Sequence, residues 1–137
     1  MNLDDSDCVE EFSEFVRRGG RWRNYEPAAL VGQWSDFVDR CVDGFEGGLA
    51  DDYFNELSSR SDLEEAMNSS ELAKYPQMEL VRSRVSAADE KLRAILIPDA
   101  FPNFPGSRWW LRGVVRYSGY KLADDLLRHF GISIEAL

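Results

Sequence analysis

The sequence has few of the residues from which catalytic and metal sites are usually built. It contains one histidine, His129, and two cysteines, Cys8 and Cys41. Zinc sites take their ligands mainly from Cys and His, so this composition argues against one. The chain also lacks a Gly-Lys-Ser/Thr phosphate loop, a Gly-x-Gly-x-x-Gly dinucleotide loop and a Gly-x-Ser-x-Gly nucleophile elbow. We therefore expect no metal, no cofactor and no enzymatic activity.

Long apolar runs are also missing. No stretch approaches the roughly 20 apolar residues that a membrane-spanning helix needs. The first five residues, Met-Asn-Leu-Asp-Asp, have neither the basic nor the apolar region of an export signal. These observations predict a cytoplasmic protein without a membrane partner. In that compartment Cys8 and Cys41, each among helix-periodic apolar residues, are expected to be reduced core thiols, and one disulfide between them is the alternative.

What the chain does contain is typical of one globular domain. Its 137 residues are 44% hydrophobic and 12% aromatic, which is enough to bury a core and too aromatic for a disordered chain. The hydrophobic spacing is mostly helical. We predict an all-α fold, a single compact bundle of five or six helices over residues 1–137.

The expected helices begin and end at recognisable residues. They cover residues 3–18, 27–46, a segment capped by Asp51 or Asp52, a short segment from the Ser61-Asp62-Leu63-Glu64 capping box to about residue 68, residues 76–96 and residues 118–129. A single turn is expected over residues 71–75. The proline-rich segment 98–106 is expected to connect helices. Trp109 to Tyr117 is expected to be helical or irregular, because no other stretch offers a clear partner strand.

The helix expected over residues 27–46 carries two stripes. Its apolar stripe predicts a face buried in the core, with Phe37 and Cys41 almost fully buried. Its acidic stripe, which we call the acidic ridge, is turned away from that face and consists of Asp36, Asp39, Asp43 and Glu46. Only Arg40 lies nearby to offset it. We expect the ridge, together with Asp51 and Asp52, to bind a partner.

Negative charge is concentrated in the first half of the chain. Residues 1–70 contain 17 acidic and 6 basic residues, whereas residues 71–137 contain 8 and 10. Such a field repels nucleic acid and speeds association with a basic protein. Two ordinary explanations compete with this one: acidic proteins are soluble, and the acids early in the helix over residues 3–18 suit its dipole.

The sequence contains two other candidate functional sites. Arg108, Arg112 and Arg116 mix with Trp109, Trp110 and Tyr117 as in a nucleic-acid surface. We favour another interpretation, in which the tryptophans pack over helix ends and the arginines pair with the acidic first half of the chain. A carboxylate pocket of an enzyme or ligand-binding protein would need acids buried beside aromatic residues, for which Asp89 and Asp124 are the candidates. His129 is assigned to the last turn of the final helix, where it stabilises the helix end.

Four groups of landmark residues carry a family resemblance. They are Trp34-x-x-Phe37-Val38, Tyr53-x-x-x-Leu57-x-x-Arg60, Asp89-x-x-Leu92 and Trp109-Trp110. In this order they resemble small acidic helical immunity proteins of bacteria, which neutralise toxins of contact-dependent and related polymorphic systems. The resemblance covers residues 30–117 and implies a cytosolic protein that binds one cognate toxin domain and blocks its active site or substrate groove.

The sequence thus predicts a binding protein, most specifically an immunity protein whose acidic surface neutralises a basic toxin. A nuclease is a suitable target because its groove is basic in order to hold phosphates. The alternative is a small enzyme or ligand-binding protein with a carboxylate pocket.

Overall fold

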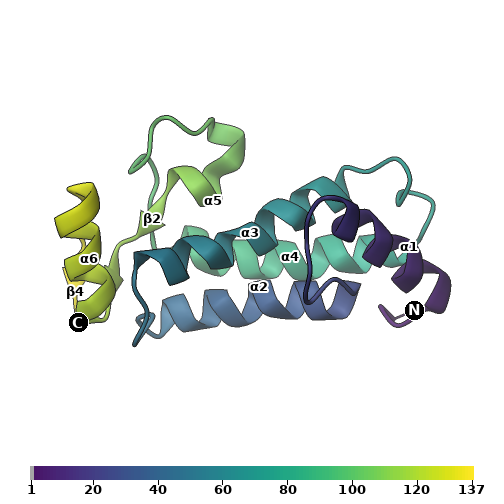
Figure 1. Ribbon diagram of the computed structural model, residues 1–137, viewed down its shortest axis with the longest axis horizontal. Helices are drawn as coiled ribbons and strands as arrows, with labels where there is room; N and C mark the ends of the chain where they lie inside the picture. Colours follow the sequence, from purple (N-terminus) through teal and green to yellow (C-terminus); the bar gives the residue numbers. More distant parts are fainter. Residues whose placement is uncertain (1) are drawn as a thin grey trace.

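The second helix is central to the fold. The computed structural model describes residues 2–137, in which α2 (Pro27–Val42) packs against both α3 (Ala50–Met67) and α4 (Gln77–Arg93). These three helices lie side by side, and α1 (Ser6–Arg18) covers one end of the layer (Figure 1). Phe37 and Cys41 are 1% and 0% exposed, so the predicted burial of this helix face is confirmed. Both cysteines are free thiols, which confirms the reduced form and excludes the disulfide.

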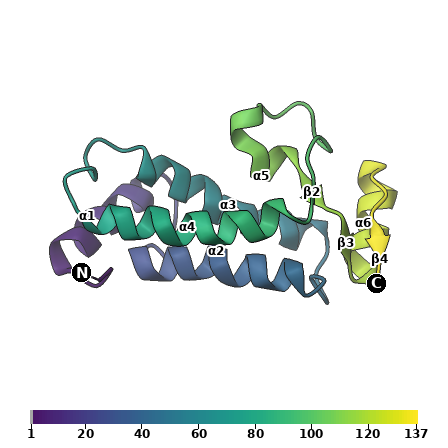
Figure 2. The ribbon, with the colours of Figure 1, turned by 180° about the vertical axis from the view of Figure 1, so that it is seen from behind.

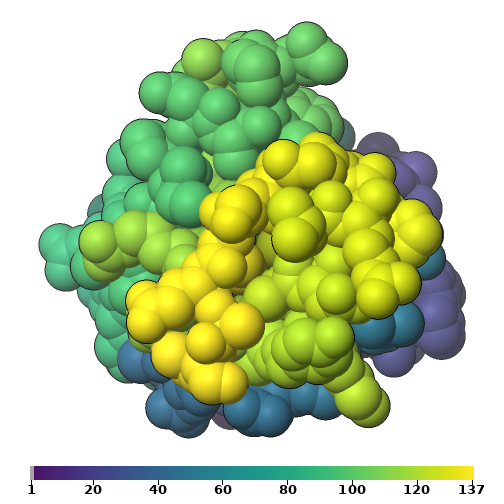
Figure 3. Space-filling model, turned by 90° about the vertical axis from the view of Figure 1, so that its left-hand side faces the viewer, coloured from purple at the N-terminus to yellow at the C-terminus, as the bar shows by residue number. Residues whose placement is uncertain are grey.

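The opposite end of the molecule is built from shorter elements. A 3-10 turn, η1 (Gly106–Arg108), leads into α5 (Trp109–Arg112), and α6 (Tyr120–Phe130) follows two short strands. Figures 1 and 2 show α5 and its preceding connector projecting from the three-helix layer, while Figure 3 shows that α6 and the C-terminal residues cover this end. In residues 2–137 no helix is long and apolar enough to cross a membrane.

The expectation of an all-α fold was correct only in its coarser form. The described residues form six α-helices, but they also form two sheets of two short strands each. In one sheet β1 (Leu96–Ile97) pairs antiparallel with β2 (Val114–Val115), and in the other β3 (Tyr117–Ser118) pairs parallel with β4 (Glu135–Ala136). The molecule is therefore mostly helical rather than purely helical.

The segment from Trp109 to Tyr117 is helical only at its start, so the expectation for its second half was wrong. The partner strand missed in the sequence is Leu96–Ile97, of which Leu96 is the last residue of the helix expected over residues 76–96. That helix ends at Arg93 instead. Ile97 precedes Pro98, and a residue before proline disfavours helical backbone, so this stretch is free to pair with Val114 and Val115.

The third helix is continuous where two helices were expected. The capping box at Ser61 does not start a new helix, since α3 runs unbroken through it from Ala50 to Met67. Within this helix Ser58 and Ser59 donate to the carbonyls of Asn55 and Glu56, each at 2.7 Å. The Ser61 hydroxyl instead accepts a hydrogen bond from the Trp110 indole at 2.9 Å. Tertiary packing thus outweighs a local capping signal.

The start of α3 receives a cap from a distant helix. The Asp52 carboxylate accepts from the Leu49 N–H at 2.9 Å, as an acid near this terminus was expected to do. The next N–H, that of Ala50, donates to the carboxylate of Asp125 in α6 at 2.8 Å. Because the first N–H groups of a helix have no partner within it, this contact stabilises both α3 and its junction with α6.

Candidate functional site

The three helical members of the acidic ridge lie on the outer face of α2. Asp36, Asp39 and Asp43 are all exposed, whereas the opposite face of the helix is buried. Asp39 forms an exposed ion pair with Lys91 of α4 at 3.2 Å. Within residues 2–137, Asp36 and Asp43 form no ion pair. Asp36 lines a shallow groove that also includes Arg84 and Lys91.

Glu46 does not lie on this helix, so the expected continuation of the helix to residue 46 was wrong. The helix ends at Val42. Gly44 has a φ of +107°, and the N–H of Phe45 donates to the carbonyl of Arg40 at 2.7 Å. This Schellman-type ending turns the chain and places the Phe45 side chain in the core. Glu46 therefore follows the turn, and its carboxyl lies over Gly119 at the start of α6.

The remaining predicted binding residues lie beyond the same turn. Asp51 and Asp52 are exposed in the first turn of α3. Asp52 lines a groove together with Glu46, Glu56, Arg40 and Arg23. The six predicted acids therefore form two neighbouring sets, one along the outer face of α2 and one at the turn between α2 and α3.

The positions of the ridge acids along α2 oppose the helix dipole. The first turn of this helix contains no acidic residue, Asp39 is in its last turn, and Asp43 is its C-cap. The C-terminal end of a helix carries a partial negative charge, so each carboxylate there is unfavourable by roughly 0.3–1 kcal/mol. Helix stability therefore does not explain why these acids are where they are.

Four of the resemblance landmarks, Trp34, Arg60, Asp89 and Trp110, meet in a partly buried polar cluster. Asp89 accepts two hydrogen bonds at 3.0 Å from Arg60, one to each carboxylate oxygen, and one at 2.9 Å from the Trp34 indole. The Arg60 guanidinium also pairs with Glu64 at 2.9 Å and lies 4.3 Å from the centre of the Trp110 ring. This cluster joins α2, α3, α4 and α5, and it involves both polar and aromatic groups.

This cluster also bears on the candidate carboxylate pocket. Asp89 is next to aromatic residues, as such a pocket requires, but its oxygens are occupied by Arg60 and Trp34. The other candidate, Asp124, pairs with Arg128 at 2.9 Å on α6. Within residues 2–137 no group of three or more His, Cys, Asp or Glu residues could hold a metal ion. Burial raises the pKa of both cysteine thiols, which keeps them protonated.

The basic and aromatic residues after position 107 are mostly internal. Trp110 is fully buried, and the Trp109 ring is covered by the guanidinium of Arg93 at 4.1 Å. Arg108 pairs with Glu65 at 2.7 Å, and Arg112 pairs with Asp99 at 2.7 Å. The tryptophans therefore pack as the favoured interpretation expected, and their rings do not form an open stacking surface. The expected pairing with the acidic first half holds for Arg108 alone, because Arg112 pairs with Asp99 and Arg116 donates to the Ala94 carbonyl at 2.6 Å.

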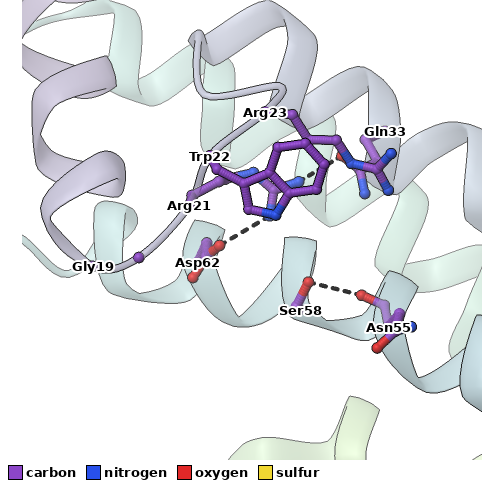
Figure 4. Close-up of a pocket in the computed structure, with 9 residues that line it drawn as sticks. Gly19, Arg21, Trp22, Arg23, Gln33, Asn55, Ser58 and Asp62 are labelled. Atoms are coloured by element: carbon purple, nitrogen blue, oxygen red, sulfur yellow. Dashed lines mark hydrogen bonds and ion pairs between the residues drawn. The ribbon is translucent and has the colours of Figure 1, made fainter.

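A polar groove beside the α1–α2 loop was not predicted. It has a volume of about 470 Å³ and is lined by Gly19, Gly20, Arg21, Trp22, Arg23, Gln33, Asn55, Ser58 and Asp62. Figure 4 shows the Trp22 indole lying across the mouth of this groove, above residues of α3. One signal of this groove is present in the loop Arg-Trp-Arg-Asn-Tyr, where the tryptophan has no periodic apolar neighbours.

His129 is in the last turn of α6, as expected. It is exposed, and its Nε2 lies 3.3 Å from the carboxylate of Asp125 one turn earlier. No nucleophile or second base is paired with it in the described part of the chain, so its contacts are those of a helix-end residue.

Comparison of the chain with protein-family models, with curated proteins and with solved structures finds no match.

Proposed function

We propose that this protein binds a basic partner protein through the acidic ridge, Asp51 and Asp52. The observation that carries the proposal is the position of the ridge on α2. Of the three exposed carboxylates, Asp39 and Asp43 lie at the end of the helix where the dipole disfavours them, and Asp36 and Asp43 have no ion pair in residues 2–137. Residues that cost stability without a structural role are typical of functional surfaces.

In its most specific form, the proposal is an immunity protein that neutralises a cognate toxin. Three features support it: the acidic first half of the chain, the convergence of the resemblance landmarks in one cluster, and the rigid helical support beneath the ridge. A nuclease is the target whose chemistry fits best, because carboxylates can occupy a groove that is built to hold phosphates. The alternative carboxylate-pocket enzyme is not favoured, because Asp89 and Asp124 are already paired.

The test compares two variants of equal charge with wild type. In the first, Asp36→Asn, Asp39→Asn, Asp43→Asn and Glu46→Gln neutralise the ridge. In the control, Glu10→Gln, Glu14→Gln, Glu90→Gln and Glu135→Gln remove the same charge from exposed positions elsewhere. The partner is isolated by co-purification from the source cell, and its affinity for each purified variant is measured by calorimetry.

We expect the ridge variant to bind at least about tenfold more weakly, because truncating desolvated charge pairs costs roughly 2–5 kcal/mol. The control variant should lose much less. Wild-type affinity should also fall as ionic strength rises towards 0.15 M, where the screening length is about 8 Å. Equal losses in both variants would show that only the net charge matters and would remove the ridge from the interface.

A further inference from the structure

Trp22 is the most exposed of the large apolar side chains in residues 2–137. It is 78% exposed, whereas Trp34 and Trp110 are fully buried. Tryptophan is on average a highly buried residue, and it is among the residues most enriched at the energetic centres of protein interfaces. The proposed function based on the ridge gives this side chain no role.

The loop that carries Trp22 is held in place by the residue before it. The side chain of Arg21 is only 6% exposed and pairs with Asp62 of α3 at 2.9 Å. It also donates to the Gln33 side chain at 2.5 Å (Figure 4). A third bond goes to the Asn24 carbonyl at 3.2 Å. Since these contacts fix the loop before any partner arrives, binding through Trp22 carries little cost in lost conformational freedom.

The groove beside Trp22 continues towards the acids at the α2–α3 turn. Arg23 and Asn55 line both the Trp22 groove and a second groove of about 390 Å³, so the two are adjoining parts of one trough. Along this trough α3 contributes polar side chains at successive turns. The trough is therefore open, elongated and polar, as a site for an extended polypeptide segment would be.

The two ends of the trough differ in charge. At the Trp22 end Asp62 is paired with Arg21, and the Arg23 guanidinium lies 5.1 Å from the centre of the Trp22 ring. At the other end three carboxylates face two guanidiniums, that of Arg23, which both grooves share, and that of Arg40, which lies over the Phe45 ring at 4.5 Å, so the acids are in excess by one. These carboxylates belong to Glu46, Asp52 and Glu56. A segment that fits both ends has an apolar side chain at one end and a lysine or arginine at the other.

We propose that this trough binds an extended segment of the partner protein, with Trp22 as its apolar anchor and Glu46, Asp52 and Glu56 as the site for a basic side chain. The inference rests on the proposed function for the sign of the partner's charge, but it places the centre of the interface at Trp22 rather than on the ridge.

The test uses a phage-displayed library of random twelve-residue peptides, selected against the wild-type protein. The affinities of the selected peptides are then measured for four variants: Trp22→Ala, the pair Glu46→Gln with Glu56→Gln, the ridge triple Asp36→Asn with Asp39→Asn and Asp43→Asn, and Leu127→Ala. Leu127 is a matched control because it is an exposed apolar residue, 55% exposed, on α6 and outside both grooves. Thermal melting verifies that each variant folds.

We expect selected peptides to carry a lysine or arginine a few residues from an apolar side chain. Their dissociation constants should rise at least tenfold in Trp22→Ala, severalfold in the Glu46 and Glu56 pair, and less than twofold in Leu127→Ala. Peptides that lose affinity in the ridge triple but keep it in Trp22→Ala would overturn this inference while leaving the proposed function standing. Peptides that depend on Trp22 but carry no basic residue would count against both this inference and the proposed function. Failure to select any peptide that discriminates wild type from Trp22→Ala also overturns the trough as a binding site.

Discussion

Two acidic helices of this molecule, α1 and α2, use their carboxylates in opposite ways. In α1, Asp5 is the N-cap and accepts from the Cys8 N–H, Asp7 is in the first turn, and Arg17 and Arg18 are in the last turn. In α2 the first turn has no acid, and Asp39 and Asp43 are at the far end. The charges of α1 complement its dipole, whereas the carboxylates of α2 oppose it, and only Arg40 in the last turn of α2 suits the dipole. The comparison teaches that acidity alone does not indicate a binding surface, but its position along a helix can.

The largest expected effect is the loss of unfolding free energy when a buried aromatic ring is removed. We expect this loss to be similar in the two helices. Phe37→Ala in α2 and Phe12→Ala in α1 each remove a ring that is at most 1% exposed. Each should lower the free energy of unfolding by about 3–5 kcal/mol through lost burial and cavity formation. Urea denaturation measures both. A loss below about 1 kcal/mol for Phe37 would mean that α2 is not a core helix, and the comparison of outer faces would lose its basis.

On the outer faces of the two helices, removing a carboxylate should change the free energy of unfolding by less, and with opposite sign in α1 and α2. Asp7→Asn removes a charge that suits the dipole of α1 and should destabilise the protein by about 0.3–1 kcal/mol. Asp43→Asn removes a charge that opposes the dipole of α2 and should stabilise it by a similar amount. Paired urea denaturation curves at low ionic strength decide the signs. If both substitutions destabilise, Asp43 has a structural role and the argument for the ridge weakens.

The smallest effect concerns an acid that is paired inside the bundle. Burial by itself would raise the pKa of Glu64, but hydrogen bonding and charge attraction from Arg60, with a hydrogen bond from Asn68, outweigh it and lower the pKa below 4.5. A lowered pKa in the folded state means that the ionised form adds stability at neutral pH, and that this is lost as the pH falls through the folded value. Glu64→Gln should therefore cost about 0.3 kcal/mol at pH 7, as expected for an ion pair one helical turn apart.

The behaviour of the two proteins at acid pH provides the control for that prediction. The difference between wild type and Glu64→Gln should shrink as the pH falls from 7 to about 3, because protonated Glu64 resembles glutamine. The midpoints of urea denaturation, measured for both proteins at several pH values, report this difference in stability. A difference that is constant across this range would show that the effect arises from packing rather than from charge.

The sequence by itself determined the helical elements that have a long amphipathic pattern. Residues 27–43 bury their apolar stripe, with Phe37 and Cys41 inside, and expose Asp36, Asp39 and Asp43, because a period of 3.6 residues places each set on one side of any helix. The first helix likewise ends at Arg18 as expected. These outcomes depend only on local spacing, which is why they could be predicted.

Where local signals in the sequence competed, contacts in the folded molecule determined which structure formed. The Schellman-type turn at Gly44 separated Glu46 from the ridge, and the Trp110 indole took the Ser61 hydroxyl that would otherwise have capped a new helix. Val114 and Val115 became a strand because Leu96 and Ile97 lay beside them. Asp125 accepts a hydrogen bond from the first N–H of α3, 75 residues away in the sequence, and Arg21 pairs with Asp62, 41 residues away. Such pairings involve groups that are far apart along the chain, and only packing of the helices brings them within hydrogen-bonding distance.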